Sequence, residues 1–213
     1  MQKAGLETRE LILQAALEAF ASRGFKGATV REICAAAGQS VGSVNYHFRD
    51  KDGLYEAVTS KLMEEIILRH EPEPPDADRL SAREKLRIFI RTYLARFGSI
   101  FSGKDNGIRG MFLMREIMDP SECFRRNFSQ LQSRQKDYLL SIISELTGQP
   151  VSKPEVMLSG ISVIGQCFHF IFGRRIFGLL GFETGRLTDI EQCVSHIEEF
   201  SLGGIMAVTG ERK

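Results

Sequence analysis

The chain has 213 residues, of which 43% are hydrophobic and 26% are charged. These proportions are typical of soluble globular proteins and exclude an intrinsically disordered chain. The 28 basic and 27 acidic side chains give a formal charge of +1, so a nucleic acid partner would have to be met by a local basic patch. The four cysteines are widely spaced, which disfavours a disulfide framework and a common zinc site.

Neither the N-terminus nor the longest apolar stretch has the pattern of a targeting segment. The first ten residues are polar and charged, unlike a secretory signal. The apolar stretch 156–172 is interrupted by Ser159, Ser162, Gln166 and His169. We therefore expect a buried helix there rather than a membrane span, and a cytoplasmic protein without a membrane partner.

Helical periodicity dominates the N-terminal part of the chain. A first helix is expected over 8–23, with Gly24 as its C-terminal stop. Thr29 and Glu32 form a capping box, which predicts the start of a short second helix that breaks at Gly38.

Two more helices are expected before the first break in composition. Ser40 is placed to cap a third helix that runs through Phe48, and Asp50 to cap a fourth over 51–70. Three of the six prolines follow in residues 71–79, a stretch that cannot continue a helix.

The remainder of the chain is also predicted to be helical, so the fold class is all-α. Ser81 and Glu84 form a second capping box, and Ser152 is placed as an N-cap ahead of Pro154. The expected helices cover 81–102, 108–118, 121–146, 153–173 and 188–208. We divide the chain into a DNA-binding domain (1–52) with a connecting helix (53–70), a Pro-rich loop (71–80) and a C-terminal domain (81–213).

The second and third helices have the layout of a helix-turn-helix, whose second member presents its N-terminal side chains to base edges in the major groove. Between Phe20 and Lys51 there are five basic and two acidic residues, a local balance that suits phosphate contacts. Phe48, Ile33 and Val44 are expected in the core, and His47 either caps or packs. The candidate DNA contacts are Thr29, Arg31, Gln39, Ser40, Val41, Gly42, Ser43, Asn45, Tyr46, His47 and Lys51.

Residues 8–58 resemble the DNA-binding domain of the TetR/AcrR family of bacterial transcriptional regulators. The resemblance rests on Gly-Phe-x-Gly-Ala-Thr at 24–29, the alanine run that ends at Gly38, and Tyr-His-Phe-x-x-Lys-x-x-Leu at 46–54. Two positions depart from the family pattern: Gln39 stands where an apolar residue is usual, and Asn45 where Tyr is more frequent. The resemblance implies an N-terminal three-helix DNA-binding domain and an all-helical C-terminal domain that dimerises through its last two long helices and binds a small effector.

The C-terminal part holds twelve of the fifteen phenylalanines, which indicates either a dense core or a cavity for an apolar ligand. Met side chains at 111, 114 and 118 suit either an adaptable pocket or core filling. Arg115 shares their face and is placed to meet a ligand or the carbonyls at the C-terminal end of the same helix. Polar groups of the 153–173 helix need a ligand, a neighbouring helix or a second subunit as partner. The candidate effector residues are Phe97, Met111, Phe112, Met114, Arg115, Met118, Gln166 and His169.

Catalysis is not expected, because the four histidines are isolated and no metal, cofactor or nucleophile motif occurs. The sequence predicts a sequence-specific regulator, foremost a repressor, that binds a pseudo-palindromic operator as a homodimer and is released by an apolar or amphipathic effector. The alternative is a helical scaffold or protein-interaction module without DNA binding of its own. Salt dependence separates the two, since only DNA binding displaces phosphate counterions.

Overall fold

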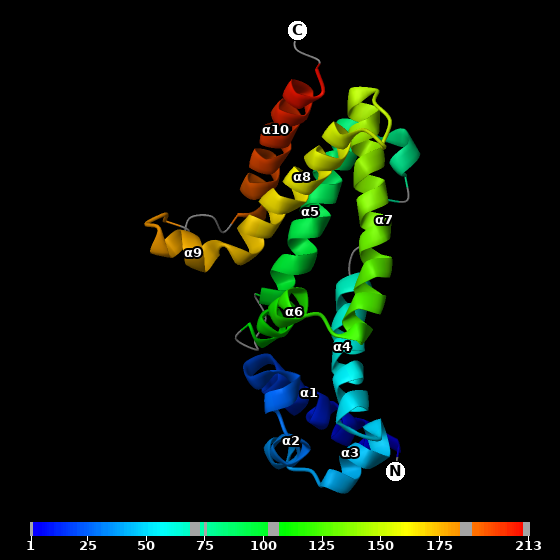
Figure 1. Ribbon diagram of the computed structural model, residues 1–213, viewed down its shortest axis with the longest axis vertical. Coiled ribbons are helices and arrows are strands. Elements are labelled where there is room, and N and C mark those ends of the chain that lie inside the picture. Colours follow the sequence, from blue (N-terminus) through cyan, green and yellow to red (C-terminus); the bar gives the residue numbers. More distant parts are fainter. Residues whose placement is uncertain (1, 69–72, 75, 102–106, 184–188, 211–213) are drawn as a thin grey trace. The chain divides into compact units, whose positions relative to one another are not determined.

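The computed structural model describes residues 2–68, 73–74, 76–101, 107–183 and 189–210. Over these residues the protein is all-helical, without a strand (Figure 1). The elements are α1 (Gln2–Gly27), α2 (Val30–Ala37), α3 (Val41–Phe48), α4 (Lys51–Leu68), the 3-10 turn η1 (Ala77–Arg79), α5 (Ala82–Phe101), α6 (Ile108–Met118), α7 (Glu122–Thr147), α8 (Pro154–Phe172), α9 (Arg174–Leu179) and α10 (Ile190–Val208).

These elements form two compact units. The first unit comprises residues 1–67 and 100–130, and the second comprises 68–99 and 131–213. The first unit therefore contains α1–α4 together with α6 and the beginning of α7, although α5 and the segment around it separate α4 from α6 in the chain. The division of the chain into functional domains between 52 and 81 remains a prediction.

The first unit is organised around α1, which contacts α2, α3 and α6. Apolar side chains at helical spacing line its inner face, and Ile12, Ala16 and Phe20 have no exposed surface. The helix breaks at Gly24, whose backbone adopts φ 73° and ψ 176°. This confirms the predicted stop, although one more turn follows it as far as Gly27.

The predicted starts of the second and third helices are confirmed by their hydrogen bonds, whereas α1 begins at Gln2, six residues before the predicted start at residue 8. Thr29 Oγ1 accepts from the Glu32 amide at 3.3 Å, and a Glu32 carboxylate oxygen accepts from the Thr29 amide at 3.1 Å. Ser40 Oγ accepts from the Ser43 amide at 3.2 Å, which caps α3. Because these caps satisfy amides that have no intrahelical partner, they fix where each short helix begins.

The second unit contains η1, α5, most of α7, α8, α9 and α10. α5 is tied to α10 by Arg87, which contacts Glu198 at 2.6 Å and Glu191 at 3.2 Å, and to α7 by Lys85 and Glu145 at 2.6 Å. Between these ion pairs lies a core of large apolar side chains that are at most 1% exposed, namely Leu86, Phe89, Ile90, Leu139, Ile142, Ile143, Val156, Val163, Val194 and Ile197.

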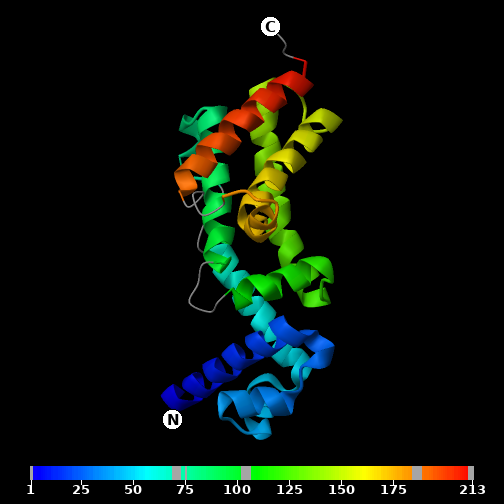
Figure 2. The same ribbon diagram turned by 90° about the vertical axis from the view of Figure 1, so that its left-hand side faces the viewer.

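α8 and α10 pack against each other in this unit (Figure 2). Among the described residues, α8 is the one helix whose length and apolar composition would suffice to cross a membrane, and 33% of its apolar window is buried inside the structure. The other side of α8 carries exposed Met157, Leu158 and Ile161. α8 is thus a packed helix with one uncovered apolar face.

Two features of the second unit differ from the prediction. α8 begins one position later than expected: Lys153 occupies the N-cap without a side-chain hydrogen bond, and Pro154 takes the first helical position. Its fixed φ suits that position, so the proline and not the Ser152 hydroxyl sets the start. The short α9 was not expected, while residues 69–70, 102 and 188, where three helix ends were predicted, lie outside the described residues.

Candidate DNA interface and regulatory elements

α3 is a short helix with one buried and one uncovered face. Val44 is fully buried and Phe48 is 6% exposed, so these two side chains anchor the helix on the first unit. The opposite face holds Val41, Gly42, Asn45 and the 85% exposed Tyr46. A helix that is held by its inner face and presents small and polar side chains outward has the geometry that major-groove reading requires.

α2 packs against α3 and has a capped N-terminus of its own. The Thr29 hydroxyl donates to the Glu32 carboxylate at 2.7 Å, and the Thr29 amide donates to the same oxygen. These two hydrogen bonds, and then the Arg23 guanidinium, hold the pKa of Glu32 below its ordinary value. The Thr29 hydroxyl is therefore already hydrogen-bonded to another group of the protein, whereas the Arg31 side chain in the same first turn is exposed.

The link between α3 and α4 is a tight turn. Arg49 adopts φ 72°, and the Asp50 carboxylate accepts from the Gly53 amide at 2.8 Å. A Cβ at Gly53 would lie 2.1 Å from the Phe48 carbonyl oxygen, so only glycine permits this approach. Lys51 begins α4 with its ammonium 4.5 Å from the centroid of the Phe25 ring, a cation–π contact that orients the charge.

The eleven candidate DNA contacts therefore lie on neighbouring elements of one unit. They belong to the capped start of α2, the turn before α3, α3 itself and the first residue of α4, and all eleven are exposed or half-buried. Their contacts with DNA remain a prediction.

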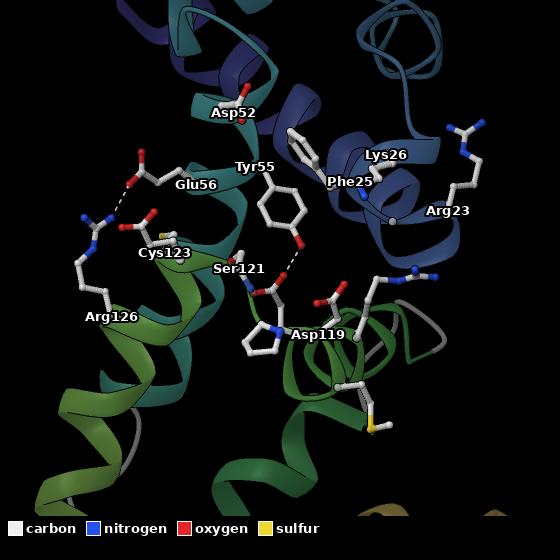
Figure 3. A pocket seen from close by; sticks show the side chains of 16 residues that line it. Arg23, Phe25, Lys26, Asp52, Tyr55, Glu56, Asp119, Ser121, Cys123 and Arg126 are labelled. Atoms are coloured by element: carbon white, nitrogen blue, oxygen red, sulfur yellow. Dashed lines mark hydrogen bonds and ion pairs between the residues drawn. The ribbon is translucent and has the colours of Figure 1, made fainter.

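A cleft of about 740 Å³ opens in the same unit (Figure 3). Its walls come from four places in the chain: the end of α1, the first turns of α4, the end of α6 and the beginning of α7. The lining residues are Arg23, Gly24, Phe25, Lys26, Asp52, Tyr55, Glu56, Arg115, Glu116, Met118, Asp119, Pro120, Ser121, Glu122, Cys123 and Arg126.

The floor of this cleft is a buried hydrogen-bonded group. The Tyr55 hydroxyl donates to one carboxylate oxygen of Glu116, and the Ser121 hydroxyl (2.6 Å) and amide (3.2 Å) donate to the other. Glu116 is 1% exposed. Burial, and next the Glu116 carboxylate, raise the pKa of Tyr55 above its ordinary value. The group joins α4, α6 and the start of α7.

Arg115 has a different partner from those expected. Its guanidinium donates to the Ser22 carbonyl oxygen at 3.4 Å, near the end of α1, and its Nη1 would lie 2.7 Å from a Cβ at Gly24. The glycine therefore also leaves room for the arginine. The break in α1 thus lies where Arg115 of α6 approaches the backbone of α1.

The eight candidate effector residues are not brought together. Phe97, Gln166 and His169 belong to the second unit, while the five from α6 belong to the first. Within α6, Phe112 is fully buried, but Met111 is 49% and Met118 is 80% exposed. Neither of these two methionines fills a core. Arg115 and Met118 line the cleft described above, in which Phe97, Gln166 and His169 have no part.

Most of the polar side chains of α8 form hydrogen bonds with groups on α8 itself or on α10. Gln166 donates to Ser201 on α10 at 3.1 Å, Ser162 donates to the Leu158 carbonyl at 2.9 Å, and a ring nitrogen of His169 lies 2.8 Å from the Gly165 carbonyl. Ser159 is 6% exposed, and its hydroxyl has no hydrogen-bond partner in the described structure.

One buried polar residue of the second unit escaped the sequence analysis. Gln135 is 1% exposed, and its side-chain oxygen has no hydrogen-bond partner among the described residues. It shares a face of α7 with Leu139 and Ile142, which are fully packed. A glutamine at a core position of an amphipathic helix was the signal that could have revealed it.

A capped helix-turn-helix, followed by a helical bundle of its own, defines this molecule as a regulator of the helix-turn-helix class. Residues 12–58 match the family of bacterial regulatory proteins called the tetR family, and residues 82–205 match the C-terminal domain of the HTH-type transcriptional dual regulator CecR. The protein therefore belongs to the TetR family of DNA-binding transcriptional regulators, with a C-terminal domain of the CecR type.

Individual relatives agree with this assignment. The chain is 26% identical over 204 residues to the dual regulator CecR of Shigella flexneri, with 91% of each chain covered. It is 26% identical over 182 residues to the regulator BetI of Escherichia coli O157:H7, covering 72% of this chain and 91% of the relative.

Solved structures share the fold. A TetR-like regulator from Rhodococcus sp. RHA1 superposes with a TM-score of 0.63 at 20% identity, covering 95% of this chain and 96% of the other. The TetR family regulator PfmR from Thermus thermophilus superposes with a TM-score of 0.59 at 20% identity, covering 91% of this chain and 97% of the other.

Proposed function

We propose that the protein is a cytoplasmic, homodimeric repressor that reads a pseudo-palindromic operator with α3 and leaves it when a small apolar or amphipathic effector binds the C-terminal bundle. The observation that carries the DNA-reading part is the uncovered face of α3. Its inner residues Val44 and Phe48 are buried, while Asn45 and Tyr46 are exposed. The outer face of α3 is therefore not part of the hydrophobic core and is open to DNA.

Homodimerisation is supported by the uncovered apolar surface of the second unit. On α8, Met157, Leu158 and Ile161 are 51–61% exposed; on α10, Phe200 is 66% exposed and Val208 59%. Monomeric proteins rarely leave such neighbouring apolar side chains in water. A second copy that brings the same two helices would cover them with twofold symmetry, which matches the paired half-sites of an operator.

Effector binding is supported by aromatic side chains and orphan polar groups in the second unit. Phe89, Tyr93, Phe97 and Tyr138 form a chain of ring contacts: the centroids lie 6.1 Å apart for Phe89 and Tyr93, 4.7 Å for Tyr93 and Phe97, and 6.4 Å for Phe89 and Tyr138. The buried oxygen of Gln135 and the buried hydroxyl of Ser159 lack partners among the described residues. Because an unpaired buried polar atom is costly, a ligand with a few polar groups on an apolar body would complete this core.

Repression is the simpler mode for a protein that leaves DNA on binding an effector, because bound repressor blocks transcription by occupancy alone. The relative CecR is described as a dual regulator, and a promoter-dependent activating role would accord with that description. The transition itself would be a population shift between two arrangements, of which only one fits the half-site spacing.

The test begins with selection of genomic DNA fragments by the purified protein, from which a pseudo-palindrome should be enriched. Single-base variants of that operator then form a panel for two substitutions. Tyr46→Ala should weaken binding to every variant by a similar factor, since a phosphate contact carries no base information. Ser43→Ala should alter the ranking at particular bases. If the two substitutions gave the same profile, the proposed docking of α3 would be wrong.

The scaffold alternative predicts a different result from the same selection. A protein-interaction module would enrich no sequence at any salt concentration, because it makes no contacts with base edges or phosphates. No observation in the described structure favours this alternative over DNA reading.

A further inference from the structure

The cleft of the first unit has the size and lining of a ligand site in its own right. Its volume of about 740 Å³ lies within the range of roughly 300–1,000 Å³ that small-molecule sites occupy. All sixteen lining residues belong to the unit that carries the helix-turn-helix. It is therefore separate from the C-terminal bundle that is proposed to bind the effector.

The apolar part of the cleft is aromatic and sulfur-bearing. Phe25 and Tyr55 meet edge to face with their centroids 5.1 Å apart, and Met118, whose side chain is 80% exposed, also lines the cleft. Aromatic faces and a polarizable thioether favour a ligand with an apolar body, and the rings also attract a cation.

The charges of the cleft are unevenly paired. Arg126 pairs with Glu56 at 3.1 Å and Arg23 with Glu32 at 3.1 Å, while Arg115 donates to the Ser22 carbonyl. The carboxylates of Asp52, Asp119 and Glu122 have no ion pair or hydrogen bond among the described residues, and Lys26 is the one lining ammonium. Because a carbonyl oxygen does not neutralise the Arg115 guanidinium, these three carboxylates face two cations without a carboxylate partner, Lys26 and Arg115, and the unpaired charge is negative by one.

Asp119 is the carboxylate best placed to meet a ligand at the floor. It is exposed, and the Tyr55 hydroxyl lies within reach of both its charge and the opposite charge of Arg115. Figure 3 shows it projecting toward the centre of the cleft from the end of α6, beside Tyr55. A protonated amine there would gain a carboxylate partner and an aromatic neighbour together.

One lining residue links the cleft to the candidate DNA contacts. The Phe25 ring contacts Tyr55 on the cleft side and also carries the Lys51 ammonium, 4.5 Å from its centroid. Asp52, which lines the cleft, follows Lys51 directly. A ligand that packs against Phe25 therefore changes the surroundings of a candidate phosphate contact.

We propose that this cleft is a second ligand site, which takes an organic amine with an apolar body and, when occupied, weakens DNA binding through Phe25 and Lys51. This site lies beyond the effector site proposed for the C-terminal bundle, and it acts on the reading unit directly.

The first test observes the cleft without DNA. Methionine methyl groups labelled with carbon-13 give one NMR signal for each of the seven methionines, and Met118→Leu assigns the signal of the cleft. Met111, on the same helix but outside the lining, is the internal control. The probes are benzylamine, 2-phenylethylamine and hexylamine, each beside its carboxylate counterpart: benzoate, phenylacetate and hexanoate.

At least one amine should shift the Met118 signal with saturation below about 10 mM, while Met111 and the carboxylate titrations remain unchanged. Asp119→Asn should weaken that binding by about threefold to fivefold, as expected for a partly exposed charge pair. Glu18→Gln, which removes an exposed carboxylate of α1 outside the lining, should leave it unaltered. No saturable shift with any amine, or equal binding of the carboxylates, would overturn the proposed site.

The second test adds operator DNA. The bound amine should lower the DNA affinity of the wild type, and the same concentration should act less on Asp119→Asn. If the amine occupied the cleft and DNA affinity did not change, the proposed link through Phe25 would be refuted. A chain that bound no DNA at all would contradict the proposed function but leave the Met118 titration valid.

Discussion

The hydroxyl of Tyr55 donates a hydrogen bond to the buried carboxylate of Glu116, which lies 61 positions further along the chain. Ser121 completes the group with two donors to the other carboxylate oxygen. Because Tyr55 stands one turn after the start of α4 and Glu116 stands in α6, the contact makes the position of α4 dependent on α6 within one unit. A displacement of α6 would therefore strain or break this bond to the helix that follows α3.

Removing the Tyr55 hydroxyl should destabilise the protein. Tyr55→Phe leaves a buried carboxylate one donor short, which costs about 1–3 kcal/mol in the free energy of unfolding. Urea denaturation followed by circular dichroism measures this difference. Tyr46→Phe removes the same atom from a side chain that is 85% exposed and should change stability by less than about 0.5 kcal/mol. Equal effects of the two substitutions would contradict the assigned role of Glu116.

The capping box of α2 should make stability depend on acid pH. In the folded protein the Thr29 donors lower the pKa of Glu32 from its ordinary 4.5, so the ionised carboxylate stabilises the fold. This contribution is present above pH 4.5 and is lost as the pH falls through the lowered value. The difference in unfolding free energy between wild type and Glu32→Gln should therefore shrink from pH 7 toward pH 3. A difference that stayed constant over this range would show that the carboxylate charge has no part in the cap.

Glycine should be required at position 53 for steric reasons. In Gly53→Ala the new methyl group would meet the Phe48 carbonyl oxygen at 2.1 Å, so the turn between α3 and α4 must open. We expect a loss of about 1–3 kcal/mol in unfolding free energy, together with weaker DNA binding. Gly5→Ala, inside α1 with no atom within 4 Å of the new Cβ, should be neutral or stabilising by up to about 1 kcal/mol. Similar losses at both glycines would disprove the steric explanation.

A charge in the exposed apolar face of α8 should dissociate the dimer. Ile161→Glu places a carboxylate among side chains that the second copy is proposed to cover, and burying it unpaired is costly. Sedimentation velocity should then report monomers, and operator affinity should fall at least about tenfold. Leu6→Glu, at a side chain of α1 that is 65% exposed, should leave the mass unchanged. Dimers that persisted in Ile161→Glu would place the interface elsewhere.

Local signals in the sequence predicted the helices well, because capping depends on residues only three positions apart. Thr29 with Glu32 and Ser81 with Glu84 both mark helix starts that the structure confirms. The predicted start of α8, which was one residue too early, also depended on local signals. Ser152 and Pro154 compete to define a start, and the proline defines it.

The cleft was not predictable from local patterns. Its walls join residues near 25, 55 and 120, and the contact between Tyr55 and Glu116 has no local signature. Arg115 was recognised as a functional cation on α6, but its partner, the Ser22 carbonyl, depends on the break at Gly24 and on how α1 meets α6. Pairings between distant segments follow from packing, which periodicity alone does not determine.

The salt dependence of operator binding is the sharpest test of DNA reading by α3. Affinity for the enriched pseudo-palindrome and for a scrambled duplex would be measured from low to physiological salt, for wild type and for Lys51→Ala. We expect a preference for the operator and a log–log slope of about −4 or steeper, which the substitution reduces in magnitude by about one for each phosphate that is no longer neutralised. A slope near zero, or equal affinity for both duplexes, would contradict DNA reading by α3.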